Sequence, residues 1–505
     1  MWLKRFRLFF AVVSIVLFSS IFIIPQMPQK IASLSQFAPN AIGGVALLSL
    51  SAWGVLFVII VMTLLFGRVY CSFICPLGIA QDVAIYLAKN RKGRRGGCHS
   101  SSDRYLFLRY SILLITVVLL LVGFAMPLGI VEPFSIFGRF ITAVIKPVFV
   151  WINNFLSDSG LVPIYPCAYS PFSLAAFLLG FGSFVAVLVF AFFRNRLFCN
   201  SLCPVGTLLG LLSRFSLVKI VFNQSDCVQC GQCTQVCKAN CIDYENKTID
   251  YERCVACFNC LNACGPGAIA YGKSRLKYLL GESTEKVSVS RRRFVVVGGA
   301  AAAAALISRK VIAHDASCNL PVMPPGARNI NRFTSACTAC HLCVSNCPGN
   351  VLKPALLQYG IAGYMQPRLD FEAGMCEYDC TLCTEICPSG ALTRMSRESK
   401  QTLKIGTARF CRRLCVVRTE GTHCGACAEI CPTGAVHMVP WHHGLTIPQV
   451  EPEQCIGCGA CEHVCPVRPQ RAITVRGVSE HTQVQMPENN PAPVPTVEGE
   501  ENFLF

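Results

Sequence analysis

The chain has 505 residues, of which 53% are hydrophobic and only 14% are charged, a balance that excludes an ordinary soluble globular protein. Its formal net charge is +17. The basic residues cluster beside apolar segments, where they set the orientation of a membrane protein, so we expect no nucleic-acid partner. The 33 cysteines would suit a secreted disulfide scaffold, but their regular spacing argues against one.

Four apolar segments in the first 222 residues predict a four-helix membrane domain. Each approaches the length of about 20 apolar residues that crosses a hydrocarbon core of ~30 Å. They cover residues 7–24, 46–66, 105–127 and 173–193. Basic residues concentrate before the first segment and after the second and fourth. This pattern predicts that the N-terminus and residues 194–290 lie in the cytosol.

A fifth apolar segment, residues 134–155, is interrupted by Arg139, Lys146 and Pro147. Its apolar residues recur at helical spacing, which predicts a helix that lies on the outer membrane surface. Glu132 precedes it, at the predicted outer end of the third spanning helix. An acid at that position is either a proton acceptor or a solvated residue of the interface.

Two C-x3-C-P motifs follow the second and fourth helices: CSFICPLG, with Cys71 and Cys75, and CNSLCPVG, with Cys199 and Cys203. Neither pair could hold a cluster alone, but together they supply four thiols. They either form a shared metal or iron–sulfur site or act as redox-active or structural thiols where another domain docks. The near-repeat predicts that the membrane domain contains two copies of a two-helix unit.

Residues 223–275 contain two runs with C-x2-C-x2-C-x3-C spacing, which is typical of bacterial ferredoxins that bind 4Fe-4S clusters. The fourth cysteine of each run reaches the cluster of the other run. We therefore predict two ligand sets: Cys227, Cys230, Cys233 and Cys264, and Cys254, Cys257, Cys260 and Cys237. Zinc or disulfides are poor alternatives for two complete runs. One departure is that Lys238, not proline, follows Cys237.

Residues 276–313 form a basic linker followed by the stretch SRRRF and a short, alanine-rich apolar run. This pattern is typical of a twin-arginine export signal and predicts a fifth membrane crossing. A plain stop-transfer helix is the alternative. Because Val311-Ile312-Ala313 is only a weak cleavage site, an uncleaved anchor is favoured. This export route suits a domain that crosses the membrane already folded around clusters inserted in the reducing cytosol.

Residues 314–478 contain four more cysteine runs, which predict an exported α+β domain with four 4Fe-4S clusters. The runs comprise Cys337, Cys340, Cys343 and Cys347; Cys376, Cys380, Cys383 and Cys387; Cys415, Cys424, Cys427 and Cys431; and Cys455, Cys458, Cys461 and Cys465. Cys411 is an alternative to Cys415. Cys340-His341 completes a C-x-x-C-H haem pattern, but its cysteines belong to a complete ferredoxin run, so we expect no haem.

The remaining cysteines are expected to be ordinary thiols: Cys98, Cys167, Cys241, Cys318 and Cys411. Residues 479–505 are rich in proline and polar residues and predict a disordered tail.

The order of these parts resembles two subunits of the periplasmic nitrate reductase electron-supply system. Residues 1–275 are similar to its membrane H subunit and residues 285–475 to its twin-arginine-targeted G subunit, here joined in one chain. Methylamine-utilisation ferredoxins and the membrane iron–sulfur proteins of nitrous oxide respiration share the same parts. By analogy with four-cluster ferredoxins, the first exported run is expected to exchange its fourth cysteine with the last run, and the second with the third.

The resemblance implies a protein of the bacterial inner membrane that oxidises menaquinol or another quinol. It would pass electrons through six 4Fe-4S clusters to a periplasmic reductase or carrier in anaerobic respiration. No histidine lies in the four predicted helices, which excludes a bis-histidine haem there. Two alternatives are an electron-supplying assembly or maintenance factor for a periplasmic metalloenzyme, and a conduit for cytosolic reductant. The sequence contains no recognisable terminal catalytic centre.

Overall fold

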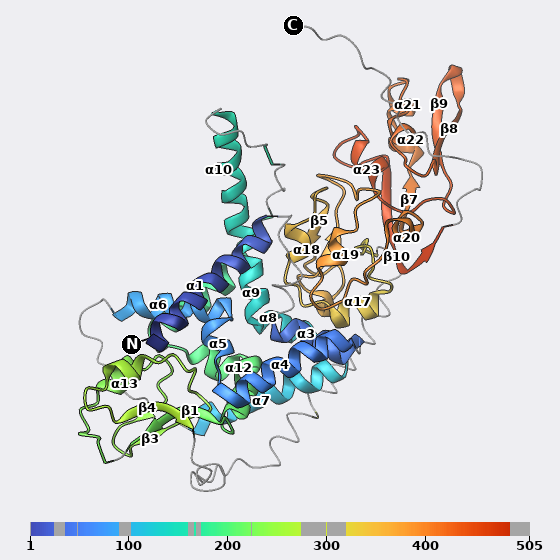
Figure 1. The fold of residues 1–505 in the computed structure, drawn as a ribbon. Coiled ribbons are helices and arrows are strands. Elements are labelled where there is room, and N and C mark those ends of the chain that lie inside the picture. The colour runs from blue at the N-terminus through green and yellow to red at the C-terminus, as the bar shows by residue number, and fades with distance from the viewer. Residues whose placement is uncertain are drawn as a thin grey trace.

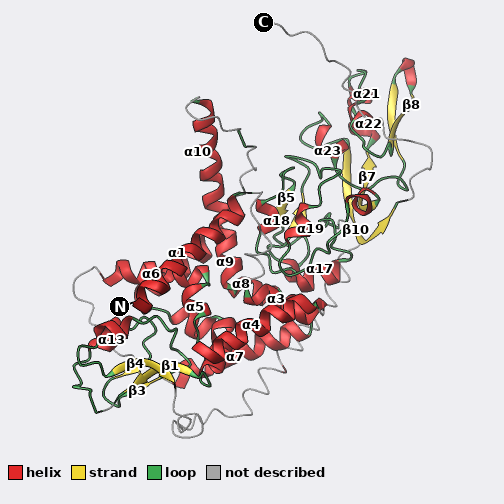
Figure 2. Ribbon diagram, in the orientation of Figure 1, coloured by secondary structure: helices red, strands yellow, loops and turns green. Residues whose placement is uncertain are grey.

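The computed structural model describes residues 2–24, 36–47, 49–89, 103–159, 166–167, 173–223, 225–273, 299 and 320–484. The twin-arginine-like segment, Cys98, Cys318 and the end of the chain lie outside these residues. The described chain forms a helical domain with a small β-containing domain at one end and a second, larger one at the other (Figure 1). Figure 2 shows that strands are confined to the two β-containing domains.

The helical domain is built from α-helices and two short π-helical turns, written η1 and η2. The elements are α1 (Trp2–Ile23), α3 (Phe37–Leu47), α4 (Leu50–Phe66), α5 (Tyr70–Phe73), α6 (Pro76–Lys89), α7 (Asp103–Leu121), α8 (Met126–Val131), α9 (Pro133–Phe140), η1 (Ile141–Ile145), α10 (Lys146–Asp158), α11 (Leu174–Arg194), η2 (Phe198–Leu202) and α12 (Pro204–Ser213). Apolar side chains on α1, α4, α10 and α11 are exposed, as expected for helices that face lipid.

Within the described ranges, three helices are long and apolar enough to cross a membrane: Trp2–Ile23, Pro133–Asp158 and Leu174–Arg194. The first and third agree with predicted spans, whereas α4 and the apolar part of α7 are shorter. The second is the segment predicted to lie on the membrane surface. It forms one helix of 26 residues, so its length also suits a crossing.

The interruptions expected in this helix are accommodated locally. Pro147 has no N–H to donate, and the π-helical turn η1 directly before α10 absorbs the missing hydrogen bond. Arg139 is buried, and its guanidinium donates to the carbonyl oxygens of Gly129 and Ile130 at 3.0 and 3.1 Å. Glu132 is also buried and not solvated: it caps α9 by accepting hydrogen bonds from the backbone N–H groups of Phe134 and Ser135.

The predicted repeat is visible as two copies of a long helix, a short turn of helix and a proline-started helix. In the first copy these are α4, α5 and α6, and in the second they are α11, η2 and α12. The copies are exchanged in space, because α11 packs against α6 and α4 packs against α12. The two C-x3-C-P motifs therefore meet in the middle of the helical domain.

The smaller β-containing domain comprises β1 (Val218–Phe222), α13 (Gln232–Val236), β2 (Ile242–Asp243), β3 (Thr248–Ile249), α14 (Asn259–Ala263) and β4 (Ile269–Lys273). Strands β1 and β4 form one antiparallel pair, with Ile220 opposite Tyr271, and β2 pairs with β3. Strands β1 and β4 are the first and last strands of this domain, so their pairing brings its two ends together. The two cysteine loops therefore lie on one compact core.

The larger β-containing domain consists of short helices and strands that lie between and around its four cysteine runs. The helices are α17 (Ile330–Ala336), α18 (Leu342–Ser345), η3 (Ile361–Gly363), α19 (Leu382–Ile386), α20 (Arg397–Gln401), η4 (Arg412–Leu414), α21 (Val416–Thr419), α22 (Ala426–Glu429), η5 (His442–Gly444) and α23 (Ala460–Val464). The strands, in three antiparallel pairs, are β5 (Leu352–Pro354) with β6 (Pro367–Leu369), β7 (Leu403–Phe410) with β10 (Ile473–Gln483), and β8 (Val436–Pro440) with β9 (Thr446–Val450).

Strand β10 extends past the predicted domain end at residue 478. Thr482 and Gln483 pair with Lys404 and Leu403 of β7, and Glu480 forms a bridge with Asn329. The predicted start of a disordered tail at residue 479 was therefore wrong, because tertiary pairing orders a polar stretch that has little local preference for a strand.

Candidate iron–sulfur sites and their connection

The two predicted cysteine sets of the smaller domain each line one cavity. Cys227, Cys230, Cys233 and Cys264 surround the first, and Cys237, Cys254, Cys257 and Cys260 surround the second. Each set combines three cysteines of one run with the fourth of the other, which is the exchange predicted from the spacing.

Cys241, which the sequence analysis left as an ordinary thiol, also lines the second cavity. Its Sγ lies 3.5 Å from that of Cys237. The sequence holds a signal for this arrangement, because Cys237 lacks the usual following proline and a second cysteine stands four residues later. Cys241 is therefore a candidate to share or replace the role of Cys237.

In the larger domain the third and fourth runs exchange their last cysteines. Cys415, Cys424, Cys427 and Cys465 line one cavity, and Cys431, Cys455, Cys458 and Cys461 line another. The cavity contains Cys415, whereas Cys411 is exposed at the surface. Of the two alternatives, the structure therefore brings Cys415 to the site.

The first and second runs of this domain form the other pair. Cys387 is an electrostatic neighbour of Cys337, Cys340 and Cys343, and Cys347 is a neighbour of Cys376 and Cys383. The expected exchange of first with last and second with third run was wrong. Runs that are adjacent in the sequence exchange instead, because each pair shares one compact core.

The backbone around these thiols is shaped for a bulky cluster. In four of the six runs the residues on both sides of the second cysteine have positive φ, and five of these eight residues are not glycine: Gln229, Ala256, Phe258, Ala339 and His341. Such residues are unfavourable in the left-handed region and persist where the surroundings demand it. They turn the loop around the cavity, so the residues present fit a 4Fe-4S cluster, which needs four thiolates.

His341 takes part in this loop geometry rather than facing outward. Its side chain is buried, and Nε2 lies 2.8 Å from the backbone oxygen of Met365. Burial lowers the pKa of His341 to about 3, so the imidazole is neutral in the folded protein. The structure therefore gives this histidine a packing role within a ferredoxin loop.

The four sites of the larger domain follow one another. The first run packs on the helical domain, where a hydroxyl of Ser135 donates to the carbonyl of Thr338 at 3.1 Å. The second site touches the fourth-run site, because the N–H of Cys376 donates to the carbonyl of Cys458 at 2.9 Å. The third-run and fourth-run sites are neighbours, because each contains the last cysteine of the other run. The order is thus first, second, fourth and third, leading away from the helical domain (Figure 1).

Helix α1 contacts both β-containing domains. Near its start, Arg7 donates to the carbonyl of Cys257 at 3.4 Å. Near its end, the carbonyl oxygens of Phe22 and Ile21 accept hydrogen bonds from Ser345 and Asn346, the latter at 3.1 Å. Arg7 and Phe22 are fifteen residues apart, which is about 22 Å along a helix. The two domains therefore lie at opposite ends of the helical domain.

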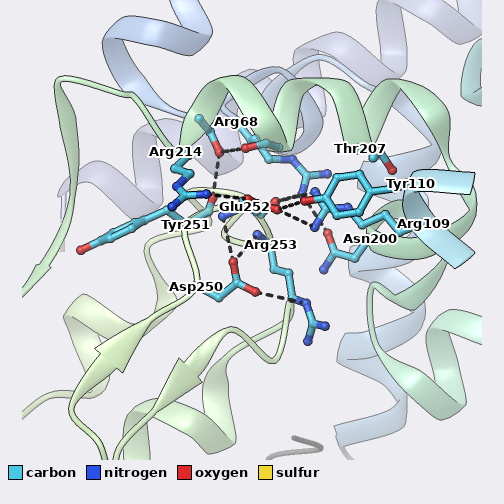
Figure 3. A network of polar contacts seen from close by, with 12 residues as sticks. Arg68, Arg109, Tyr110, Asn200, Thr207, Arg214, Asp250, Tyr251, Glu252 and Arg253 are labelled. Carbon is cyan, nitrogen blue, oxygen red and sulfur yellow. Dashed lines mark hydrogen bonds and ion pairs between the residues drawn. The ribbon is translucent and has the colours of Figure 1, made fainter. Parts of the chain in front are cut away.

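A buried polar network anchors the smaller domain, centred on Glu252 (Figure 3). Its carboxylate accepts a hydrogen bond from Tyr110 at 2.6 Å and pairs with Arg109 at 3.3 Å. Its backbone oxygen accepts from Arg68 at 2.8 Å. Glu252 stands two residues before Cys254, so these contacts hold a cysteine loop against the helical domain.

A second anchor is centred on Asp82 of α6. Its carboxylate pairs with Arg7 of α1, with Arg196 at 2.7 Å and with Lys238 of the smaller domain at 3.0 Å. All four side chains are at least four-fifths buried. Lys238, which occupies the position of the usual proline after the fourth cysteine, therefore serves to join the two domains.

Comparison with known families finds iron–sulfur segments in both the helical domain and the two β-containing domains. A family described as a 4Fe-4S binding domain matches residues 48–95 and again 176–223, which contain the two C-x3-C-P motifs. A second 4Fe-4S binding domain matches residues 224–240. Two 4Fe-4S dicluster families match residues 336–392 and 422–468, the same two pairs of runs that the structure brings together.

Curated relatives match parts of the chain. The methylamine utilization ferredoxin-type protein MauN of Paracoccus denitrificans is 29% identical over 175 residues, 34% of this chain and 48% of its own. The ferredoxin-type protein NapH of Haemophilus influenzae is 26% identical over 195 residues, 37% of this chain and 54% of its own. The ferredoxin-type protein NapG of Escherichia coli is 39% identical over 104 residues, 20% of this chain and 43% of its own.

The chain thus spans about half the length of the curated relatives it matches. No solved structure matches it significantly. The three candidate spanning helices are compatible with a protein of the inner membrane. The family matches and the ferredoxin-type relatives together support an iron–sulfur electron-transfer protein.

Proposed function

We propose that this chain oxidises a quinol, such as menaquinol, in the bacterial inner membrane and delivers the electrons outward to a periplasmic reductase. The smaller domain would hold two 4Fe-4S clusters in the cytosol, and the larger one four in the periplasm after export through the twin-arginine signal. The observation that carries the proposal is the single file of four cysteine sites that starts on the helical domain. Such a file passes electrons in short steps away from the membrane.

The first site of the file suits entry of electrons from the membrane. Its loop lies directly on α8 and α9, where Gly129 and Gly138 allow the carbonyls of Thr338 and Cys340 to approach so closely that a Cβ atom would collide with them. Quinol oxidation itself is supported by the likeness of this chain to NapH and NapG. The resemblance to the H and G subunits of the periplasmic nitrate reductase system implies that the electrons come from quinol.

The last site of the file suits exit of electrons to a separate protein. Arg412, Arg413 and Arg418 lie within three residues of Cys415 and are exposed. Arg409 and Arg468 add two more exposed positive charges near the same cavity, against the exposed acids Glu420 and Glu429. A basic rim of this kind favours an acidic partner by electrostatic steering.

The proposal is tested with the full chain reconstituted in lipid vesicles and a reduced menaquinol analogue. We expect the visible absorbance of the clusters to bleach. Cys340→Ser at the entry site should block reduction of the file. The matched variant Cys424→Ser at the exit site should leave the inner sites reducible but stop delivery to an acceptor. If the clusters are reduced by a cytosolic donor and never by quinol, the proposal is wrong.

A further inference from the structure

The second cavity of the smaller domain contains one thiol more than a 4Fe-4S cluster can use. Cys237, Cys254, Cys257 and Cys260 line it together with Cys241, which is only 6% exposed and is not in a disulfide. A 4Fe-4S cluster takes four thiolates, so one of the five has another role. The 4Fe-4S family that matches this part of the chain ends at residue 240 and leaves Cys241 unassigned.

The backbone marks Cys237, and not Cys241, as the metal ligand contributed by this loop. The N–H of Cys241 donates to Sγ of Cys237 at 3.5 Å, and the N–H groups of Ala239 and Asn240 donate to the same sulfur. Asn240 has a φ of +50°, which turns the loop so that these groups converge. Converging backbone N–H groups form a site for a negatively charged atom. The sulfur of Cys237 therefore suits a metal-bound thiolate.

The sulfur of Cys241 contacts two other sulfurs of the same cavity. It lies 3.5 Å from Sγ of Cys237 and also forms a hydrogen bond with Cys254. These two partners belong to one predicted ligand set but come from different cysteine runs. A thiol that binds no metal is protonated at neutral pH, and its S–H is a stronger donor when the acceptor is negatively charged. Cys241 is therefore placed to donate a hydrogen bond to a ligand from either run.

The helical domain fixes the loop that carries Cys241. The N–H of Arg196 donates to the carbonyl of Lys238 at 3.1 Å. The side-chain amide of Asn200 donates to the carbonyl of Ala239 at 3.4 Å. Both acceptors lie between the two cysteines in the sequence. The distance between the two sulfurs is therefore held by contacts with the helical domain as well as by the loop itself.

The surroundings of this cavity oppose reduction of a cluster in one respect and favour it in another. Reduction adds a negative charge, and burial disfavours that charge. Two buried cations counteract this effect: Arg7 donates to the carbonyl of Cys257 at 3.4 Å, and Arg68 is an electrostatic neighbour of Cys254. A hydrogen bond to a ligating sulfur acts in the same direction as the cations, because it stabilises the more negative, reduced state.

We propose that Cys241 binds no iron and instead donates a hydrogen bond to the ligating sulfurs of Cys237 and Cys254, which raises the reduction potential of the buried cluster. When the cluster takes up one electron, the proton stays on Cys241 and no bond forms or breaks. The inference rests on the proposed function only for the presence of this cluster. It depends neither on quinol nor on the direction of electron flow.

The test is a redox titration of the purified full chain, followed by low-temperature EPR and by iron and sulfide analysis. Cys241→Ala should retain the full iron content. At a fixed potential its ratio of reduced to oxidised cluster should fall about tenfold, which is about 59 mV for one electron. Cys241→Ser keeps a hydroxyl donor and should restore most of the potential. The control Cys411→Ala, which alters an exposed thiol, should shift nothing.

Two further variants make the result unambiguous. Cys257→Ala removes a ligand, so the EPR signal that it abolishes belongs to this cluster. Cys241→Val has no donor but fills the space of the thiol, so it should lower the potential as Cys241→Ala does even if the smaller side chain destabilises the domain. Loss of the iron of one cluster in Cys241→Val would make Cys241 a ligand, and an unchanged potential would make it a packing residue. Either result would overturn the inference, and because no quinol is present, neither depends on the quinol assay.

Discussion

Removing the carboxylate of Asp82 should cost far more stability than removing an ordinary acidic group. Asp82 is the counter-charge of Arg7, Arg196 and Lys238, which come from the first helix, the second C-x3-C-P copy and the smaller β-containing domain. The side chain of Arg196 is 0% exposed and that of Asp82 is 8% exposed. Asp82→Asn would leave three buried cations close together without an anion.

The magnitude follows from the burial of the pair partners. Breaking a buried ion pair from one side costs about 3–5 kcal/mol, whereas an exposed pair contributes about 0–1 kcal/mol. The matched control is Glu372→Gln, because Glu372 pairs with Lys353 but its side chain is 80% exposed. We expect Asp82→Asn to lower the free energy of unfolding by about 3 kcal/mol or more, and Glu372→Gln by less than about 1 kcal/mol.

The assay is detergent- or denaturant-induced unfolding of the reconstituted chain, followed by loss of cluster absorbance and by protease cleavage of residues 225–273. Asp82→Asn should release the smaller domain at lower denaturant concentration, and Asp82→Glu should restore part of the loss. If Asp82→Asn and Glu372→Gln have the same small effect, the three cations are solvated in solution and the reasoning from burial fails.

Three further outcomes are expected. Cys415→Ser should remove the iron of one cluster from the exported domain, whereas Cys411→Ser should not, as iron and sulfide analysis would reveal. Gly457→Ala should prevent assembly of the fourth-run cluster, because its Cβ would lie 2.5 Å from the backbone of β7 at a φ of +78°. Gly434→Ala, at a φ of +66° with no atom within 4 Å of its Cβ, should cost only about 1–2 kcal/mol, so equal cluster loss in both would contradict this. Burial alone would raise the pKa of Asp82, but Arg196, Lys238 and Arg7 lower it from 3.8 to about 2. Its contribution of about 2 kcal/mol is present above pH ~4 and should be lost as the pH falls from ~4 through ~2, measured by unfolding at each pH.

The cysteine sets show how far sequence reasoning reaches. Local spacing fixes which three thiols wrap one cavity, so the exchange within residues 223–275 follows from the sequence alone. With four runs in one domain, spacing does not say which two runs share a core. The analogy with four-cluster ferredoxins therefore predicted the wrong pairs of runs. The choice between Cys411 and Cys415 likewise depends on where the chain turns after β7, which local spacing leaves open.

The helix Pro133–Asp158 shows a different limit. Arg139 and Pro147 are unfavourable in an uninterrupted membrane helix when considered in isolation, which led to the prediction of a surface helix. The structure satisfies Arg139 with two backbone carbonyls and absorbs Pro147 in a π-helical turn. Both solutions depend on neighbouring segments.

The hydrogen bonds at the end of α1 have a consequence for biogenesis. The last carbonyls of a helix have no partner within it, and leaving them bare in a nonpolar environment is unfavourable. Here Ser345 and Asn346 supply donors to Phe22 and Ile21, although Ser345 is synthesised 323 residues after Phe22. The helix made first is thus completed by a loop made late. Carrying both on one polypeptide keeps the local concentration of that loop high and fixes the ratio of the two parts at one to one.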